Sequence, residues 1–313
     1  MTHPLASPRR GWRVLALLAL AVLVVVAMQR MDLARAATQL ATVRAEWLVL
    51  AMACYATILP LWAWQWTLLS PGAPEPRGRE MLGVVAITSA VLNTTPMLVG
   101  EAAAVVLLVA RARLDRAAAM SVLAMDQLLV GIAKLCVLAV AAMAAPLPGW
   151  MTRAVLALLG GLLLLGGALV VAAWRHADVT ATLTHVTSPR LAAAIGAFAG
   201  SLDPLRSPSR GLPALGLALL KKAVEVGAIV CVQRAFGVHL PISAAVLVLA
   251  VLNLATLLPI VPGNVGVFEG AVVFALTPLG VPLEQALGIA VVQHLCYFIA
   301  LALPGLLAAM RDR

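Results

Sequence analysis

The sequence predicts an all-α, polytopic integral membrane protein with about six full spans and two re-entrant or broken helical segments in an inverted repeat. Three observations lead to this fold class. Of the 313 residues, 63% belong to the set AVILMFWYC and 11% are charged, whereas soluble domains have about 45–50% and about 25%. The apolar residues form stretches long enough to cross a bilayer. Two of these stretches contain proline and polar residues in their middle, which interrupts a helix.

The composition also excludes several classes of protein. A mean hydropathy of +1.03 leaves too little polar surface for a soluble domain of this size. The formal charge of +9 arises from 22 Lys and Arg against 13 Asp and Glu. In so apolar a chain, a basic excess indicates cytoplasmic loops, so we expect no nucleic-acid partner.

Eight apolar segments approach the roughly 20 residues that a helix needs to cross the hydrocarbon core. They cover approximately residues 12–28, 47–69, 82–109, 117–145, 151–174, 211–233, 243–281 and 285–310. The first is interpreted as an uncleaved anchor. Trp47 and Trp66 fall at the two ends of the second, where an indole ring is expected at the lipid headgroups.

Two of the segments are interrupted. Residues 82–109 contain Asn-Thr-Thr-Pro at 93–96, and residues 243–281 contain Pro-Ile-Val-Pro-Gly-Asn at 259–264. Irregular backbone at membrane depth must be buried in protein or line a wet cavity. The 28 residues of the first segment would extend about 42 Å as a helix, which is more than one crossing and less than two. This length predicts a re-entrant pair of half-helices, while 243–281 fits either a re-entrant pair or two thin spans.

The distribution of basic residues predicts the topology. With both interrupted segments returning to their starting side, 14 Arg lie on one side, five lie on the other, and three Lys lie in the membrane, which accounts for all 22. The positive-inside rule then places both termini in the cytoplasm of a multi-pass protein of the inner (plasma) membrane. Residues 1–313 form one transmembrane domain with halves at approximately 47–174 and 211–310, joined by a cytoplasmic loop at 175–210.

Several features of the first half recur in the second, in the same order. Ala-Val-Leu-Asn occurs at 90–93 and at 250–253. Each copy is followed by a proline, a glycine four residues later and a glutamate: Pro96, Gly100 and Glu101, then Pro262, Gly266 and Glu269. Asp126-Gln127 lies 30 residues after the first proline, and Gln293-His294 lies 31 residues after the second. Inverted repeats with matching interrupted helices mark transporter substrate sites near the membrane midplane.

Residues 258–269, Leu-Pro-Ile-Val-Pro-Gly-Asn-Val-Gly-Val-Phe-Glu, closely resemble the second motif of the lysylphosphatidylglycerol synthase transmembrane-region family, roughly LPxxPGGxGxxE. Thr95-Pro96 through Gly100-Glu101 resembles its first motif. The resemblance covers almost the whole chain and implies a flippase-like membrane domain, here without the soluble aminoacyl-transferase domain of some members. Asn264 replaces a glycine of the motif, and Ala104 and His294 stand where the family commonly has arginine.

The candidate substrate-binding residues are those at the breaks and the ionisable residues inside the spans. The backbone N–H groups around Pro96 to Gly100, and those of Gly263, Asn264 and Gly266 after Pro262, would hold a phosphate-bearing headgroup with Lys221 or Lys222. Glu101 and Glu269 would set charge selectivity or couple protons, or would only cap their half-helices. Lys221, Lys222 and Glu225 either neutralise one another or bind the lipid phosphate. Asp126 and His294 complete the candidate set, and Lys134 is interpreted as pairing with another helix.

We therefore expect a transporter that moves a phospholipid or lipid-linked intermediate across the inner membrane. The alternative is a membrane-embedded scaffold or accessory protein for a lipid-modifying or lipid-biosynthesis enzyme. The sequence contains no DxxD, HExxH or paired histidines, so we expect no enzymatic activity, no metal and no cofactor. The expected partner is a membrane lipid. A lipid-synthesis enzyme as partner, and a homo-oligomer formed through small residues such as Gly160, both remain open.

Overall fold

The computed structural model describes residues 43–70, 78–95, 99–144, 160, 164, 208–256 and 261–311. Throughout these ranges the chain is helical, with short connections and no strand, so the all-α prediction is confirmed for them. The predicted spans 12–28 and 151–174 and almost all of the predicted loop 175–210 lie outside the described residues, and so does Pro96.

The first half of the described chain contains two long helices with a pair of short helices between them. These elements are α3 (Ala45–Leu69), α4 (Gly78–Thr94), α5 (Val99–Ala110) and α6 (Arg116–Ala144). The predicted interruption of segment 82–109 is confirmed, because α4 ends at Thr94 and α5 begins at Val99. The Asn-Thr-Thr-Pro sequence therefore ends a helix, as the missing donor of a proline requires.

The second half repeats this order of long and short elements. It contains α11 (Pro208–Ala235), α12 (Ile242–Ala255), the 3₁₀ turn η1 (Pro262–Asn264), α13 (Val267–Leu276), the 3₁₀ turn η2 (Thr277–Leu279), α14 (Leu283–Leu301) and α15 (Leu303–Arg311). Segment 243–281 is thus also interrupted, as predicted. Pro304 lacks the N–H that would continue α14 without a bend, and a single turn residue separates α14 from α15.

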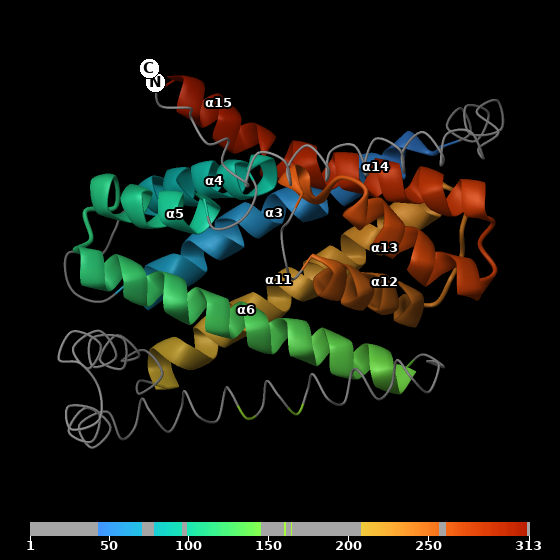
Figure 1. The fold of residues 1–313 in the computed structure, drawn as a ribbon, viewed down its shortest axis with the longest axis horizontal. Helices are drawn as coiled ribbons and strands as arrows, with labels where there is room; N and C mark the ends of the chain where they lie inside the picture. Colours follow the sequence, from blue (N-terminus) through green and yellow to red (C-terminus); the bar gives the residue numbers. More distant parts are fainter. Residues whose placement is uncertain are drawn as a thin grey trace, which may run out of the picture.

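Helices α3 and α11 pack against each other at the centre of the molecule (Figure 1). The Arg44 N–H at the start of α3 donates to the Ala235 carbonyl at the end of α11, at 3.0 Å. The start of α14 lies at the same end, because Gln285 Nε2 donates to the Phe236 carbonyl at 3.0 Å. The two central helices therefore run antiparallel, and the short helices flank them on opposite sides.

The two halves are interlocked through their last helices. The long helix α6 of the first half contacts α11 and α12, and α14 and α15 of the second half contact α3 and α4. The first short helix of each half, α4 or α12, thus packs against the final helix of the other half. The break between α4 and α5 also meets the second break directly, because α4 contacts η1.

Three described stretches are long and apolar enough to cross a membrane: Ala45–Leu69, Ala118–Ala144 and Leu283–Met310. Helix α11 has 28 residues, about 42 Å, but carries Lys221, Lys222 and Glu225 near its middle. The prediction that Trp66 lies at the headgroups is wrong. Its ring is 1% exposed and packs edge-on against Trp62 with ring centroids 5.4 Å apart, because this face of α3 points into the protein.

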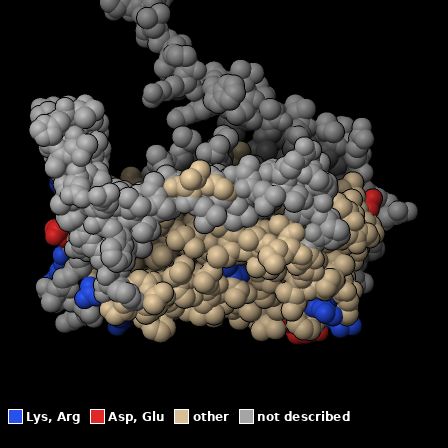
Figure 2. Space-filling view, turned by 90° about the horizontal axis from the view of Figure 1, so that it is seen from below, with Lys and Arg blue, Asp and Glu red and all other residues tan. Residues whose placement is uncertain are grey.

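Many large apolar side chains are exposed on the surface of the described residues. The exposed fraction of large side chains such as Val49, Trp64, Met143 and Phe274 lies between 51% and 89%. Figure 2 shows a broad, largely uncharged face, with charged residues towards its two ends and a small basic area near its middle. Exposed apolar area of this extent is uncommon on soluble monomers. It is the expected lipid-facing surface of a membrane protein.

Candidate functional site

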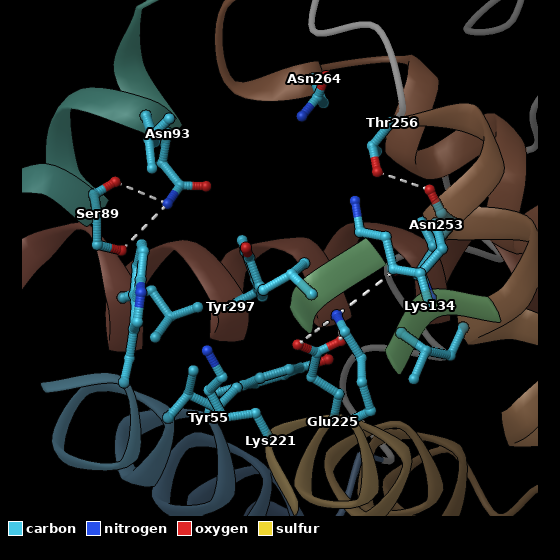
Figure 3. A pocket seen from close by; sticks show the side chains of 18 of the residues that line it. Tyr55, Ser89, Asn93, Lys134, Lys221, Glu225, Asn253, Thr256, Asn264 and Tyr297 are labelled. Carbon is cyan, nitrogen blue, oxygen red and sulfur yellow. Dashed lines mark hydrogen bonds and ion pairs between the residues drawn. The ribbon is translucent and has the colours of Figure 1, made fainter. Parts of the chain in front are cut away.

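A cavity of about 350 Å³ lies where the two breaks meet the central helices (Figure 3). The break regions contribute the ends of α4 and α12, the η1 turn and the starts of α5 and α13, and α3, α6, α11 and α14 supply the remaining walls. The polar lining residues are Tyr55, Trp62, Ser89, Asn93, Glu101, Asp126, Gln127, Lys134, Lys221, Lys222, Glu225, Asn253, Thr256, Asn264, His294 and Tyr297. The site is therefore built from both halves of the chain.

The η1 turn approaches the end of α4 through a glycine. Gly263 has φ +64°, and a Cβ at this position would lie 3.1 Å from the Asn93 carbonyl oxygen. Only glycine accepts both the left-handed backbone and the close approach without strain. Asn264, which replaces a glycine of the family motif, also has a positive φ of 53°. Asparagine adopts this conformation more readily than most residues, so the substitution preserves the turn.

Polar side chains complete the ends of the short helices beside the cavity. Asn93 Nδ2 donates to the Ser89 carbonyl at 2.8 Å. Thr95 Oγ1 donates to the Val91 carbonyl, and Thr256 Oγ1 donates to the Leu252 carbonyl, each at 2.7 Å. The Val91 and Leu252 carbonyls also accept the backbone N–H groups of Thr95 and Thr256, each at 2.9 Å. The side-chain bonds therefore add a second donor to these carbonyls and give the polar side chains a partner at the helix ends.

The first charged pair in the cavity joins α6 to α11. Lys221 Nζ lies 3.9 Å from Asp126 Oδ1, and both side chains are buried. Trp62 Nε1 donates to the other carboxylate oxygen at 3.3 Å, and the Lys221 ammonium lies 5.4 Å from the centroid of a Trp62 ring. Trp62 thus supports both charges, through a hydrogen bond to the anion and a cation–π contact with the cation.

The second charged pair lies within α11. Lys222 Nζ contacts both oxygens of Glu225, at 2.9 and 2.8 Å, and also the Asn253 Oδ1 at 3.5 Å. The predicted pairing of the two lysines with Glu225 is confirmed for Lys222 alone, since Lys221 pairs with Asp126. The structure therefore separates two adjacent lysines into two different interactions.

Two charged residues that line the cavity have no such partner. Lys134 forms no hydrogen bond or ion pair with any residue in the described ranges, so the pairing expected for it is not found there. One carboxylate oxygen of Glu101 is buried and likewise has no hydrogen-bond partner among the described residues. Asp126 and Lys134 both line the cavity, as expected for residues eight positions, or about two turns, apart on one helix.

Glu269 lies one layer behind the cavity wall and holds the start of α13. Its Oε2 accepts a hydrogen bond from the Gly266 N–H at 2.6 Å, and its Oε1 lies 2.7 Å from His294 Nδ1. The His294 ring stacks on Phe268 with centroids 4.3 Å apart and itself lines the cavity. Glu269 therefore connects the second break to α14 as a capping side chain.

A model of the lysylphosphatidylglycerol synthase TM region family matches residues 13–305 of this chain. The chain belongs to this family. No curated protein and no solved structure matches it in the corresponding comparisons. The family match covers both break regions and all the cavity residues, so the resemblance drawn from the two motifs is confirmed. Membership of a family of membrane domains also agrees with the apolar helices.

The structure brings many of the predicted site residues together at the cavity and places the others around it. Those that line it are Glu101, Asp126, Lys221, Lys222, Glu225, Gly263, Asn264 and His294. Gly100 packs against Leu92, Pro262 begins η1, and Gly266 is the N-cap of α13. Pro96 lies outside the described residues.

Sequence reasoning missed the neutral polar lining. Asn93 and Asn253 both line the cavity, although the sequence marks them only as the ends of a repeated tetrapeptide and, for Asn93, as the start of a break. Their equivalent places before the two breaks were a usable signal. Tyr55, Trp62 and Tyr297 also line it, and the signal for these was a polar atom on an aromatic ring in the middle of an apolar span.

The capping role of Glu269 predicts different effects for two substitutions. Glu269→Gln keeps an oxygen that accepts from the Gly266 N–H, whereas Glu269→Ala removes it. We expect the alanine variant to lose about 0.5–2 kcal/mol of stability, the range for lost helix caps, and the glutamine variant to lose less. Thermal unfolding in detergent, followed by circular dichroism, would measure both. Equal loss in the two variants would contradict the capping role.

Proposed function

We propose that this protein translocates a phospholipid or lipid-linked intermediate across the membrane, using two re-entrant units in an inverted repeat around the central cavity. The observation that carries the proposal is the cavity itself. Its polar and charged walls lie between two helix breaks, although the outer surface is apolar. Charged groups inside a membrane domain are costly and mark substrate or ion pathways.

The order of elements supports an inverted repeat. Helices α3, α4, α5 and α6 correspond to α11, α12, α13 and the α14–α15 pair, and α3 runs antiparallel to α11. The short helices α5, α12 and α13 have 12, 14 and 10 residues, all below the roughly 20 needed for one crossing. Figure 1 shows α4 starting and α5 ending at one end of the molecule, and α12 starting at the other.

Equivalent side chains occupy equivalent places in the two halves. Asn93 and Asn253 lie in the last turns of α4 and α12, and both line the cavity. Glu101 and Glu269 are each the third residue of the helix that follows the break. The unequal spacing of these glutamates from their glycines in the sequence thus disappears in the structure. This correspondence supports the interpretation that the two breaks are equivalent parts of an internal repeat.

The distribution of arginines supports an inner-membrane protein with both termini in the cytoplasm. Arg79, Arg111, Arg113 and Arg116 lie at the end of the molecule where α4 starts and α5 ends. Arg44 and Arg234 lie at the opposite end, where α3 starts and α11 ends. The end richer in arginine is the cytoplasmic one by the positive-inside rule.

In the proposed mechanism, the headgroup enters the cavity while the acyl chains stay in lipid. The surrounding amides and charges replace the hydration that the headgroup loses. A volume of about 350 Å³ is at the lower end of the range for small-molecule pockets, and it suits a headgroup rather than a whole lipid. Access from alternate sides through the two breaks would complete the transfer.

The test is reconstitution of the purified protein into vesicles that contain phospholipids. These lipids carry, on an acyl chain, a fluorophore that dithionite reduces. We expect added dithionite to quench more than the outer-leaflet fluorescence, and only in vesicles that contain protein. Protein-free vesicles are the control. Absence of protein-dependent quenching for every headgroup, with correctly folded protein in the vesicles, would exclude translocation and leave the accessory role. Chemical conversion of the lipid in detergent would instead indicate an enzyme.

A further inference from the structure

The carboxylates and lysines that line the cavity are equal in number, but they do not all form ion pairs with one another. Among the described residues, the lining contains three carboxylates, Glu101, Asp126 and Glu225, and three lysines, Lys134, Lys221 and Lys222. The pairs Asp126–Lys221 and Lys222–Glu225 account for two of each. One carboxylate and one ammonium remain without an ion-pair partner in the described part of the chain. They are Glu101 and Lys134.

These two groups are carried by different elements of the first half. Glu101 lies in the first turn of α5, beside the break, and Lys134 lies in the second half of α6. Each therefore offers a separate point of attachment for a ligand. Because neither group has an ion-pair partner within the described residues, a ligand that brings an opposite charge to each gains from both interactions.

Two buried amide atoms at the second break also lack a hydrogen-bond partner within the described residues. Asn253 Nδ2 and Asn264 Oδ1 are buried and have no hydrogen-bond partner among the described residues. The first is a donor, which suits a phosphate oxygen, and the second is an acceptor, which suits an ammonium or hydroxyl group. The neutral lining thus repeats the pattern of the charges, with one free group for an anion and one for a cation.

We propose that the cavity selects a net-neutral, zwitterionic headgroup with one phosphate and one ammonium group. This inference rests on the proposed function and names the class of lipid that the site takes. Lys134 binds the phosphate and Glu101 binds the ammonium. A headgroup with phosphate alone leaves the Glu101 charge uncompensated. A lysyl-bearing headgroup carries two ammonium groups, and the described lining has one free carboxylate for them.

The experiment uses the reconstituted full-length protein and three acyl-labelled lipids that differ in headgroup charge. These are phosphatidylethanolamine, phosphatidylglycerol and lysylphosphatidylglycerol. Their headgroups carry one, no and two ammonium groups beside the phosphate, so their net charges are zero, −1 and +1. We expect dithionite quenching to report translocation of phosphatidylethanolamine at least about tenfold faster than either of the others, the ratio that a favourable interaction of about 1.4 kcal/mol produces.

Variants identify the residues behind this preference. Glu101→Gln is expected to slow the translocation of phosphatidylethanolamine to within about threefold of the phosphatidylglycerol rate. The reason is that the charge that recognises ammonium is lost. Lys134→Gln is expected to slow the translocation of all three lipids, because each of them carries the phosphate that Lys134 binds. Glu101→Asp keeps the charge and should keep the preference. Glu46→Gln is the matched control, because Glu46 is exposed in the first turn of α3 and does not line the cavity.

The possible outcomes separate the two proposals. Equal rates for the three lipids, or a higher rate for phosphatidylglycerol or lysylphosphatidylglycerol, overturns the zwitterion proposal while translocation stands. No protein-dependent quenching overturns both. If Glu101→Gln does not fold, competition on the unmodified protein decides: free phosphoethanolamine should inhibit quenching more strongly than glycerol phosphate. Accumulation of radiolabelled phosphoethanolamine inside the vesicles would show that the substrate is a free zwitterion and would overturn the lipid assignment.

Discussion

Lys222→Met is expected to destabilise the protein by about 3–5 kcal/mol, the cost of leaving one partner of a buried ion pair without the other. Lys222 contacts both oxygens of Glu225 at 2.8 and 2.9 Å, and the two side chains are only 12% and 15% exposed. Removal of the ammonium leaves the Glu225 carboxylate in a site with little water. Equilibrium unfolding in mixed detergent and SDS micelles would measure the loss.

The double variant Lys222→Met and Glu225→Met is the control for this prediction. We expect it to recover most of the lost stability, because two apolar side chains of similar size replace the pair without leaving a buried charge. A double variant as unstable as the single one would contradict the ion pair as the source of the effect. The recovered variant also tests function. Normal translocation would mean that the pair only balances charge, and lost translocation would give it a part in substrate binding.

Gly305→Ala is expected to destabilise the protein by about 1–3 kcal/mol, the usual cost of overpacking a well-packed contact. Gly305 lies where α15 crosses α4, and a Cβ there would overlap the Ala86 carbonyl group and approach the Ala90 side chain. The backbone of α4 cannot yield as a flexible side chain does, so the two helices must separate. Thermal unfolding in detergent would report the loss as a lower melting temperature.

Gly83→Ala provides the matched comparison. Gly83 lies on α4 as well, but a Cβ at this position meets no atom within 4 Å. Alanine favours a helix over glycine by roughly 0.5–1 kcal/mol, so this variant should be as stable as the original protein or more stable. If both substitutions stabilise the protein, the close crossing of α15 and α4 does not exist in solution.

Local chemistry in the chain was sufficient to predict the membrane class, the helical fold and the two interruptions. Burial in lipid requires long apolar helices, and proline with polar neighbours ends a helix wherever it occurs. These are properties of composition and of a few adjacent residues. The same reasoning identified Glu101 and Glu269 at the starts of half-helices, and both are the third residue of the helix that follows a break.

Only the packing of helices far apart in the chain decided which polar groups meet. Lys221 and Lys222 are neighbours in sequence, yet one pairs with Asp126 on α6 and the other with Glu225 on its own helix. Trp66 faces the protein interior, and Lys134 lines the cavity without an ion-pair partner in the described ranges. A helix that is apolar on all sides can turn any of its faces towards lipid or towards the protein interior. The contacts between helices select one rotation, and they thereby determine which side chains line the cavity.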